Sequence, residues 1–291
     1  MPELITNNLL GIVENATLTP MVAYRIDEDG HPYVPLGDGG IVLGVELGDP
    51  AFATAGDHVA AGVSLVHPDP GARFALTAFA CVGNEAVVLS GAAAGRRGRV
   101  IGKRGESGRV LVGFDDDVMR ALLPGDRVSV RSVGQGFQPL GVDPAIEVLS
   151  LDPALYDLLP ITTDDGITSV TTVTTLPSRV CGNGIGRPAQ MWDVDLAVSE
   201  GSPLLEGVDL RLGDLVAISD LDVRHNMGFR RGWLTVGVIG HGGSPMPGHG
   251  PGLVPLITGP SSVLRAVAAD PGSPRPALTD ALLAALDGRD A

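Results

Sequence analysis

The sequence predicts a mainly β protein with a few short helices, that is, a β-rich α+β fold. Glycine, with 41 residues, and proline, with 23, are scattered along the 291-residue chain. Such frequent turn residues indicate many short strands. Apolar residues make up 44% of the chain and aromatic residues only 4%, so aliphatic side chains must fill the core. The chain is therefore expected to be globular and not disordered.

The first part of the chain is predicted to form a small barrel. Strand-length runs between residues 79 and 133 alternate with turn signals. The first three recur about a dozen residues apart, a spacing typical of a meander that closes on itself. The region resembles the KOW strand–loop–strand, a small SH3-like unit. The four predicted strands are EAVVLSG, RRGRVIGKR, RVLVGF and DRVSVRSV.

Three helices are expected. The first runs from Asp116 or Asp117 to Leu123, because acidic residues favour a helix start and Pro124–Gly125 follow. The second covers 152–159, where Asp and Pro occupy the first positions. The third ends the chain, with Thr279 as its cap; its apolar face and its terminating glycine are Leu282, Leu283, Leu286 and Gly288.

Composition between residues 138 and 165 suggests a domain boundary. Asp-Pro and Leu-Pro breaks occur there and the strand pattern is weak, so we place the boundary near residue 145. Residues 1–145 then form the barrel-like domain, and residues 146–291 form a second β-rich domain that holds a His/Gly loop and the terminal helix. The strands expected in the second domain lie in GITSVTTVTTLPSRV, WDVDLAV, DLVAISDLDV and WLTVGVIGHG.

The charge of the chain argues against several classes of partner. A net charge of −14 opposes binding to nucleic acid and to anionic membranes. The most apolar stretch is interrupted by Asn84 and Glu85, so it does not predict a membrane span. The basic residues between 96 and 109 are interpreted as a solvated hairpin face in preference to an RNA contact. Cys81 and Cys181 have no metal-type spacing, so buried free thiols in a cytoplasmic protein are expected.

The loop GHGGSPMPGHGPG, residues 240–252, is the first candidate site. It contains His241 and His249, and it follows a strand whose predicted hairpin partner ends at Asp220 and Asp222. Histidine and aspartate together suit Zn, Mn or Fe, so Asp220, Asp222 and His241 are the candidate metal ligands. Simple hairpin pairing would place the two aspartates at the end opposite His241. Whether the two groups share one site is left open.

Further polar and glycine positions complete the candidate set. His241 and His249, whose pKa values lie near neutrality, are candidate acid/base catalysts, together with Asn84 and Glu85 in an otherwise apolar strand. Asn84 and Glu85 could equally be edge or bulge residues. Backbone N–H groups of a glycine loop can bind anions. The candidate ligand-binding residues are therefore Gly248, Gly250, Asn183 and Gln135. Asp57, His58 and His67 are further polar residues in the loop–strand–loop run GDHVAAGVSLVHPD.

Five of these runs together resemble the prokaryotic DUF4438 family, over roughly residues 55–260. They are GDHVAAGVSLVHPD, ACVGNEAVVLSGAAAGRRGRVIGKRG, PGDRVSVRSVGQGF, LRLGDLVAISD and the His/Gly loop. The resemblance implies a β-rich protein of two parts, with the GNEA block in the first and GHGPG in the second. A fainter similarity, in LGDLVAISDLD and the His/Gly loop, points to acetamidases and formamidases, which are metal-dependent C–N hydrolases.

Two functions follow as hypotheses. The first is a metal-assisted hydrolase or lyase that acts on a small polar substrate such as an amide, with a divalent metal (Zn, Mn or Fe). The alternative is a non-catalytic protein that uses its glycine loops to bind a small ligand or to assemble. The enzyme is favoured because Asp, His and Gly are dense after strand ends, where scaffolds carry function. A small-molecule ligand, no nucleic acid, no membrane and a homo-oligomer are the expected partners.

Overall fold

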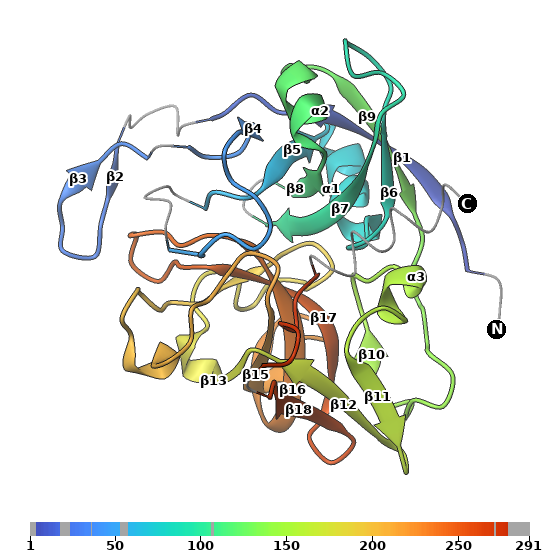
Figure 1. Ribbon diagram of the computed structural model, residues 1–291, viewed down its shortest axis with the longest axis vertical. Helices are drawn as coiled ribbons and strands as arrows, with labels where there is room; N and C mark the ends of the chain where they lie inside the picture. Colours follow the sequence, from blue (N-terminus) through green and yellow to red (C-terminus); the bar gives the residue numbers. More distant parts are fainter. Residues whose placement is uncertain are drawn as a thin grey trace.

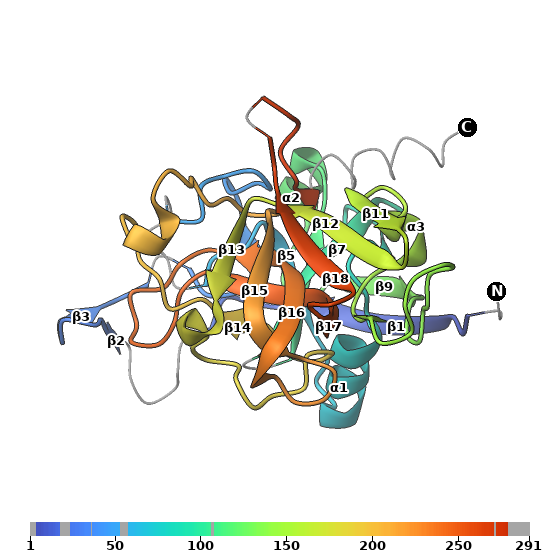
Figure 2. The ribbon, with the colours of Figure 1, turned by 90° about the horizontal axis from the view of Figure 1, so that it is seen from below.

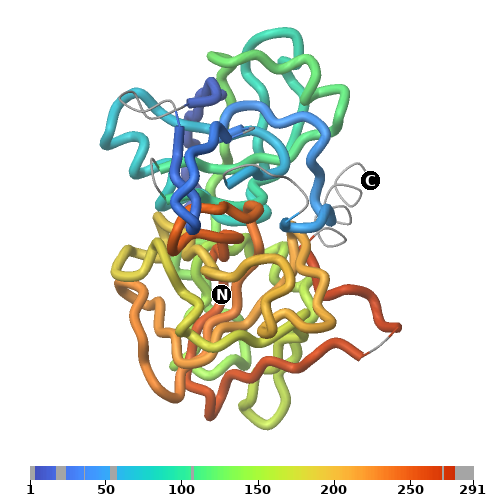
Figure 3. The backbone as a smooth tube through the Cα atoms, turned by 90° about the vertical axis from the view of Figure 1, so that its left-hand side faces the viewer, coloured from blue at the N-terminus to red at the C-terminus, as the bar shows by residue number. Residues whose placement is uncertain are grey.

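The computed structural model describes residues 4–17, 24–35, 37–52, 58–105, 108–270 and 272–278. Two β-rich parts lie one above the other, the N-terminal part on top in Figure 1. The tube in Figure 3 shows the same division, with the blue-to-green half above the yellow-to-red half. Within these residues no helix is long and apolar enough to cross a membrane. The predicted terminal helix, from Thr279 to Gly288, lies outside the described residues.

A closed six-stranded antiparallel barrel forms the N-terminal part, as predicted. The strand order is β1-β9-β6-β7-β8-β5, and β5 pairs again with β1 to close it. Each of the four predicted strands is present, as β6 to β9. The short strand β4 pairs with β5 beside the barrel, and β2 pairs with β3 as a separate hairpin. The strands are β1 (Asn7–Val13), β2 (Arg25–Ile26), β3 (Pro32–Tyr33), β4 (Ile41–Val42), β5 (Gly62–Val66), β6 (Glu85–Val88), β7 (Arg97–Arg104), β8 (Arg109–Gly113) and β9 (Arg127–Ser132).

Three short α-helices are present among the described residues. Helix α2 (Asp116–Ala121) is the predicted one, and α3 (Pro153–Tyr156) covers only the start of the predicted 152–159 segment. Helix α1 (Pro70–Phe79) was not predicted, although Asp69 caps it by accepting from Ala72 N and Pro70 begins it. The Asp-Pro pair before an apolar run was a usable signal, since both residues favour a helix start.

The C-terminal part is built on a sheet with the order β10-β17-β16-β15-β13, and β14 also pairs with β17. Strands β15 and β16 form the predicted antiparallel hairpin. A second sheet, β11-β12-β18, lies beside the first (Figure 2). The elements are β10 (Glu147–Val148), β11 (Ile161–Asp164), β12 (Ile167–Thr172), β13 (Thr174–Pro177), β14 (Val194–Asp195), β15 (Leu215–Asp222), β16 (Gly228–His241), β17 (Gly252–Pro260), β18 (Leu264–Ala268), and the 3-10 turns η1 (Ser178–Val180) and η2 (Pro203–Leu205).

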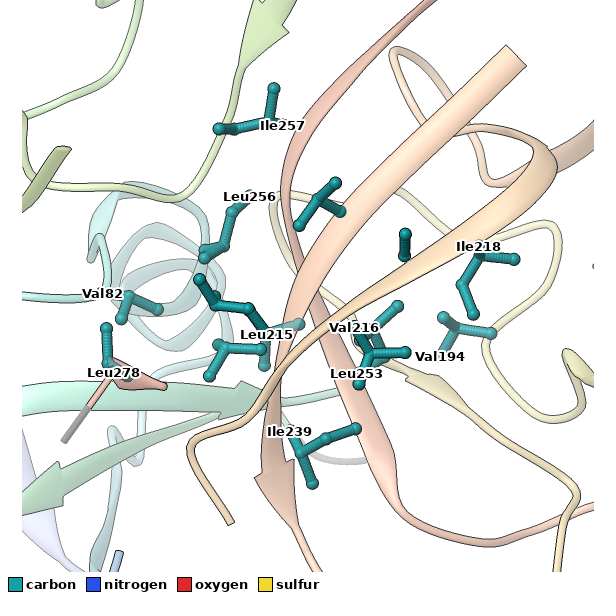
Figure 4. Packing of buried hydrophobic residues seen from close by; sticks show 14 of the residues in the cluster. Val82, Val194, Leu215, Val216, Ile218, Ile239, Leu253, Leu256, Ile257 and Leu278 are labelled. Atoms are coloured by element: carbon teal, nitrogen blue, oxygen red, sulfur yellow. The ribbon is translucent and has the colours of Figure 1, made fainter. Parts of the chain in front are cut away.

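One hydrophobic core joins the two parts. Val82 and Ile101 of the N-terminal part belong to the same buried cluster as Ile239 and Leu253 of the C-terminal sheet, and Figure 4 shows Val82 among these side chains. Strand β7 serves both cores, because Val100 packs inside the barrel while Ile101 packs in the shared cluster. The parts approach closely where glycines face one another, since a Cβ at Gly102 would lie 3.4 Å from Gly240 Cα.

The basic hairpin differs from its predicted solvated state. Arg97 is exposed, but Lys103 and Arg104, at the other end of β7, are fully buried where the two parts meet. Lys103 Nζ donates to Ser150 Oγ at 2.8 Å and to Gln190 O at 2.7 Å, and burial lowers the pKa of Lys103 to about 8. Arg104 pairs with Asp38. The expectation of a solvated face failed because the strand runs from solvent into the interface.

Because the two parts share one core, we expect the protein to unfold in a single transition. Ile101→Ala should lower the free energy of unfolding by about 2–5 kcal/mol, the cost of a cavity in a packed core. Urea denaturation followed by circular dichroism and by tryptophan fluorescence measures this. Val267→Ala, at a half-exposed position, serves as control. Two transitions, with only one moved by Ile101→Ala, would show that the parts fold independently.

Candidate metal centre

Three histidines and two aspartates meet where the two parts join. We call them the His–Asp cluster: His58, Asp193, Asp195, His241 and His249. His58 comes from the N-terminal part, shortly before β5, and the other four come from three segments of the C-terminal part. The side chains of His58, Asp193, Asp195 and His241 are at most 4% exposed, whereas that of His249 is 19% exposed. The cluster is thus buried and reaches solvent on the His249 side.

Strand β14 and the residue before it supply the two aspartates. Asp193 and Asp195 are two residues apart, so they lie on one face of the extended chain, while Val194 between them packs into the core (Figure 4). Pairing of Asp195 with Gly252 of β17 holds this strand beside the His/Gly loop. Gly105 N donates to Asp193 Oδ1 at 2.9 Å, which orients the other oxygen of that carboxylate toward His241.

His241 is the last residue of β16 and is held at both ring nitrogens. Nδ1 lies 2.9 Å from Gly242 O, so Nδ1 carries a proton and donates it to that carbonyl. Nε2 lies 2.6 Å from Asp193 Oδ2 and 3.4 Å from Asp195 Oδ1. A bare nitrogen lone pair would repel two carboxylates at these distances. A proton or a metal ion must therefore lie in this contact.

The charges of the cluster shift its acid–base properties strongly. Burial alone would lower the pKa of His241, but hydrogen bonds and charge attraction from Asp193 and Asp195 outweigh it and raise this pKa to about 10. Burial alone would likewise raise the pKa of Asp195, yet hydrogen bonds with His241, His249 and His58 hold it well below its usual range. Without a metal, His241 is therefore protonated and Asp195 is ionised at neutral pH.

His58 and His249 complete a second contact around Asp195. His58 Nε2 lies 2.8 Å from His249 Nδ1 and 3.3 Å from Asp195 Oδ2, and His249 Nδ1 lies 2.7 Å from Asp195 Oδ2. His58 has a φ of 55°, a left-handed backbone that is costly for a residue other than glycine. Such strain at a polar cluster is typical of functional sites.

The atoms of the cluster have the identity and spacing of metal ligands. Imidazole nitrogens and carboxylate oxygens bind Zn²⁺, Mn²⁺ and Fe²⁺ at roughly 2.0–2.2 Å, so atoms that share one ion lie about 3 Å apart. The edges of the His58–His249–Asp195 triangle fall in this range, at 2.7 to 3.3 Å. Nδ1 of His241 donates to a backbone carbonyl, as metal-bound histidines do through their second nitrogen.

Glycines allow the backbone to close around the cluster. A Cβ at Gly252 would lie 2.0 Å from His241 Nε2, and one at Gly250 would lie 1.8 Å from Leu196 O. Gly248 O accepts from Asn183 N at 2.9 Å, and Asn183 O accepts from Asp195 N at 2.8 Å. The predicted residues Asn183, Gly248 and Gly250 thus lie beside the cluster. Their contacts there are made by backbone atoms, so they support the ligands.

The predicted ligands Asp220 and Asp222 lie elsewhere. Leu215 pairs with Val238, which places His241 at the start of β15 and the two aspartates at its far end. Asp222 pairs with Arg224 and Arg230, and Asp220 accepts from Gly232 N at 2.8 Å. Their grouping with His241 is corrected on this ground: antiparallel pairing separates them, and arginines and a turn already satisfy their oxygens.

The other predicted residues lie at the barrel, away from the cluster. Asn84 is fully buried; its Oδ1 accepts from Cys81 N, and its Nδ2 donates to Val133 O and to Asp152. Gln135 donates to Ala78 O. Glu85 pairs with Arg97 and lines a cavity of about 320 Å³ that contains no member of the His–Asp cluster. Asn84 and Gln135 therefore tie loops of the barrel together.

Three members of the cluster were not among the site residues selected from the sequence. Asp193 and Asp195 were seen only as part of a strand, although WDVDLAV has the same Asp-x-Asp pattern as SDLD. His58 was noted only as part of the run GDHVAAGVSLVHPD. The alternation of WDVDLAV, with apolar residues between the aspartates, was the usable signal. The approach of His58 from the other part of the chain leaves no local trace.

Nuclear magnetic resonance on metal-free protein tests the charge state of the cluster. We expect the His241 ring to stay protonated at pH 8 and to titrate near pH 10, and Asp193→Asn to lower that pKa because one carboxylate is lost. Since the folded pKa is raised from 6.5 to about 10, this contact stabilises the metal-free fold fully below about pH 6.5 and ceases to do so above about pH 10. Asp220→Asn is the control. A neutral His241 at pH 8 would contradict the assignment.

Comparison with known proteins agrees with the two-part architecture. The model of the N-terminal domain of unknown function DUF4438 matches residues 24–157, and that of its C-terminal domain matches residues 158–273. The solved crystal structure of TM1086 is similar, with 34% sequence identity and a TM-score of 0.89 over 95% of this chain and 96% of that one. None of the curated proteins matches the chain. The chain therefore belongs to the DUF4438 family, as its motifs had predicted.

Proposed function

We propose that the protein is a metal-assisted hydrolase or lyase that acts on a small polar substrate such as an amide. The contact at His241 supports this most directly. Its Nε2 faces Asp193 and Asp195 while Nδ1–H donates a hydrogen bond to Gly242 O. A buried site that carries negative charge, and that is built from nitrogen and carboxylate oxygen atoms, is suited to a divalent transition metal.

The surroundings of the cluster favour catalysis over a purely structural metal site. Structural zinc sites use four protein ligands and are closed, whereas catalytic sites keep a position for water or substrate. A bound ion of this kind lowers the pKa of its water and polarises a substrate oxygen. The partly exposed edge of His249 is the side on which such a substrate could enter. Because the remaining four side chains are buried, the substrate should be small.

The roles of the chain's own residues follow from their contacts. Asp193 and Asp195 supply negative charge and hold His241 by its Nε2. Gly105 N and Gly242 O fix the orientation of Asp193 and His241 from outside the cluster. His249 lies at the solvent edge, so it would hold the metal on the side where a substrate approaches. Both cysteines are free thiols, which suits our expectation of a cytoplasmic protein.

Metal content and amide hydrolysis test the proposal together. Protein purified without an affinity tag should contain near-stoichiometric Zn, Mn or Fe by elemental mass spectrometry. It should also hydrolyse or eliminate at least one member of a panel of small amides and related polar compounds. Chelation should abolish turnover and metal should restore it. We expect His241→Ala to reduce turnover more than about 100-fold. Loss of a residue that only supports a metal ligand already costs about 10- to 100-fold, and His241 is a proposed ligand itself.

Asp222→Asn is the matched control, because Asp222 is an aspartate of the same hairpin bound only to arginines. It should retain both metal and activity. Metal-free protein that stays metal-free after reconstitution would refute the proposal. In that case a non-catalytic protein that binds small ligands or assembles through its glycine loops becomes the better explanation.

Metal affinity should rise with pH. Metal binding at His241 must displace the proton from Nε2, which Asp193 and Asp195 hold there by raising the pKa of His241 to about 10. Below that pH the apparent dissociation constant should therefore fall about tenfold for each pH unit and proton released. Calorimetric titrations between pH 6 and 8 in buffers of different ionisation enthalpy measure both the affinity and the proton count. An affinity independent of pH would mean that metal binding does not remove a proton from His241.

A further inference from the structure

We propose that the His–Asp cluster is a two-ion centre in which the carboxylate of Asp195 bridges the ions. This inference rests on the metal-binding part of the proposed function and goes beyond it in the number and placement of the ions. Asp195 connects the two proposed ion positions, because its Oδ2 faces His58 and His249 and its Oδ1 faces His241.

The ligand atoms divide into two groups. Among the described residues, one group is His58, His249 and Asp195, and the other is His241, Asp193 and Asp195. Within each group, all ligand atoms lie within 4.8 Å of one another, and Asp195 alone belongs to both. Atoms bound to one ion at about 2.1 Å lie at most about 4.2 Å apart. A single ion therefore cannot take all five residues, whereas two ions can.

Each group has the composition of an open coordination shell. The first offers two imidazole nitrogens and one carboxylate oxygen, and the second offers one imidazole nitrogen and two carboxylate oxygens. Three protein ligands at each ion leave positions for a shared water and for substrate. In two-metal sites the ions lie about 3.5–4 Å apart and stabilise both the attacking and the leaving oxygen. The centre thus fits hydrolytic chemistry.

The charges indicate what else the centre binds. One divalent ion neutralises the two carboxylates of Asp193 and Asp195. A second leaves an excess of positive charge in a buried place, which is unfavourable unless negative ligands arrive with it. A bridging hydroxide and a substrate that carries or develops negative charge would supply them. The two-ion centre therefore selects substrates whose reacting group becomes an oxyanion, as an amide carbonyl does during hydrolysis.

The two positions should differ in affinity. Asp193 is fixed by Gly105 N, and His241 is fixed by Gly242 O, so the second group is buried and ordered before metal arrives. The first group contains His249, which lies in the loop between β16 and β17 and is the most exposed member. We expect the His241 position to fill first and the His249 position to exchange more readily with solvent.

Manganese titration of chelator-treated protein tests the centre without reference to activity. Calorimetry and elemental analysis should give two ions per chain, and electron paramagnetic resonance of the fully loaded protein should show the coupled spectrum of two neighbouring Mn²⁺ ions. His249→Ala should retain one ion and lose the coupling, and Asp193→Asn should do the same at the other position. Asp222→Asn should bind two coupled ions like the parent.

Each other outcome has a defined meaning. One ion in the parent overturns the two-ion centre but leaves a single-metal enzyme standing. No ion in the parent refutes the proposed function as well. Two ions without magnetic coupling place the second one elsewhere and also overturn the inference. His249→Ala keeps the test decisive if buried-site variants fail to fold, because His249 is the partly exposed ligand, and circular dichroism verifies its fold.

Discussion

The site depends on one contact, that of His241 Nε2 with Asp193 and Asp195. Because Nδ1 is committed to Gly242 O, the other nitrogen can face two carboxylates only if a proton or a metal ion lies between them. That requirement explains why the pKa of His241 is raised to about 10 and why that of Asp195 is depressed. The contact also requires glycine at position 252, because a Cβ there would overlap the His241 imidazole.

The shared core of the two parts makes this contact possible. Strand β7 ends beside the cluster, so Gly105 N reaches Asp193, while Ile101 of the same strand packs into the C-terminal core. The loop after β16 makes a second contact between the two parts, since Gly242 N donates to Val59 O, next to His58. The complete His–Asp cluster therefore forms only when the barrel and the C-terminal sheet are docked, because His58 comes from the barrel part and the other four residues come from the C-terminal part.

Local patterns in the sequence predicted the barrel well and the site only in part. Strands β6 to β9 were recognisable because each alternates and is bounded by turns, and the β15–β16 hairpin follows from adjacency. His241 and His249 stood out through their glycines. Asp220 and Asp222 were grouped with His241 in the sequence analysis, but two Asp-x-Asp strands look alike in sequence, and the structure places Asp193 and Asp195 beside His241. Which of the two strands faces His241 is decided by pairing of β14 with β17, a long-range contact without a local signal.

Burial of so many charges at the interface is itself an argument for function. Removing ionised groups from water costs more than their pairing usually returns, and apolar residues of similar size would give equal or greater stability. Aliphatic side chains could therefore fill the place of His58, Asp193, Asp195 and His241 in a core that is otherwise made of Val, Leu and Ile. A fold that keeps three histidines and two aspartates in one interior contact, with a strained backbone at His58, gives up stability there, as is typical of functional sites.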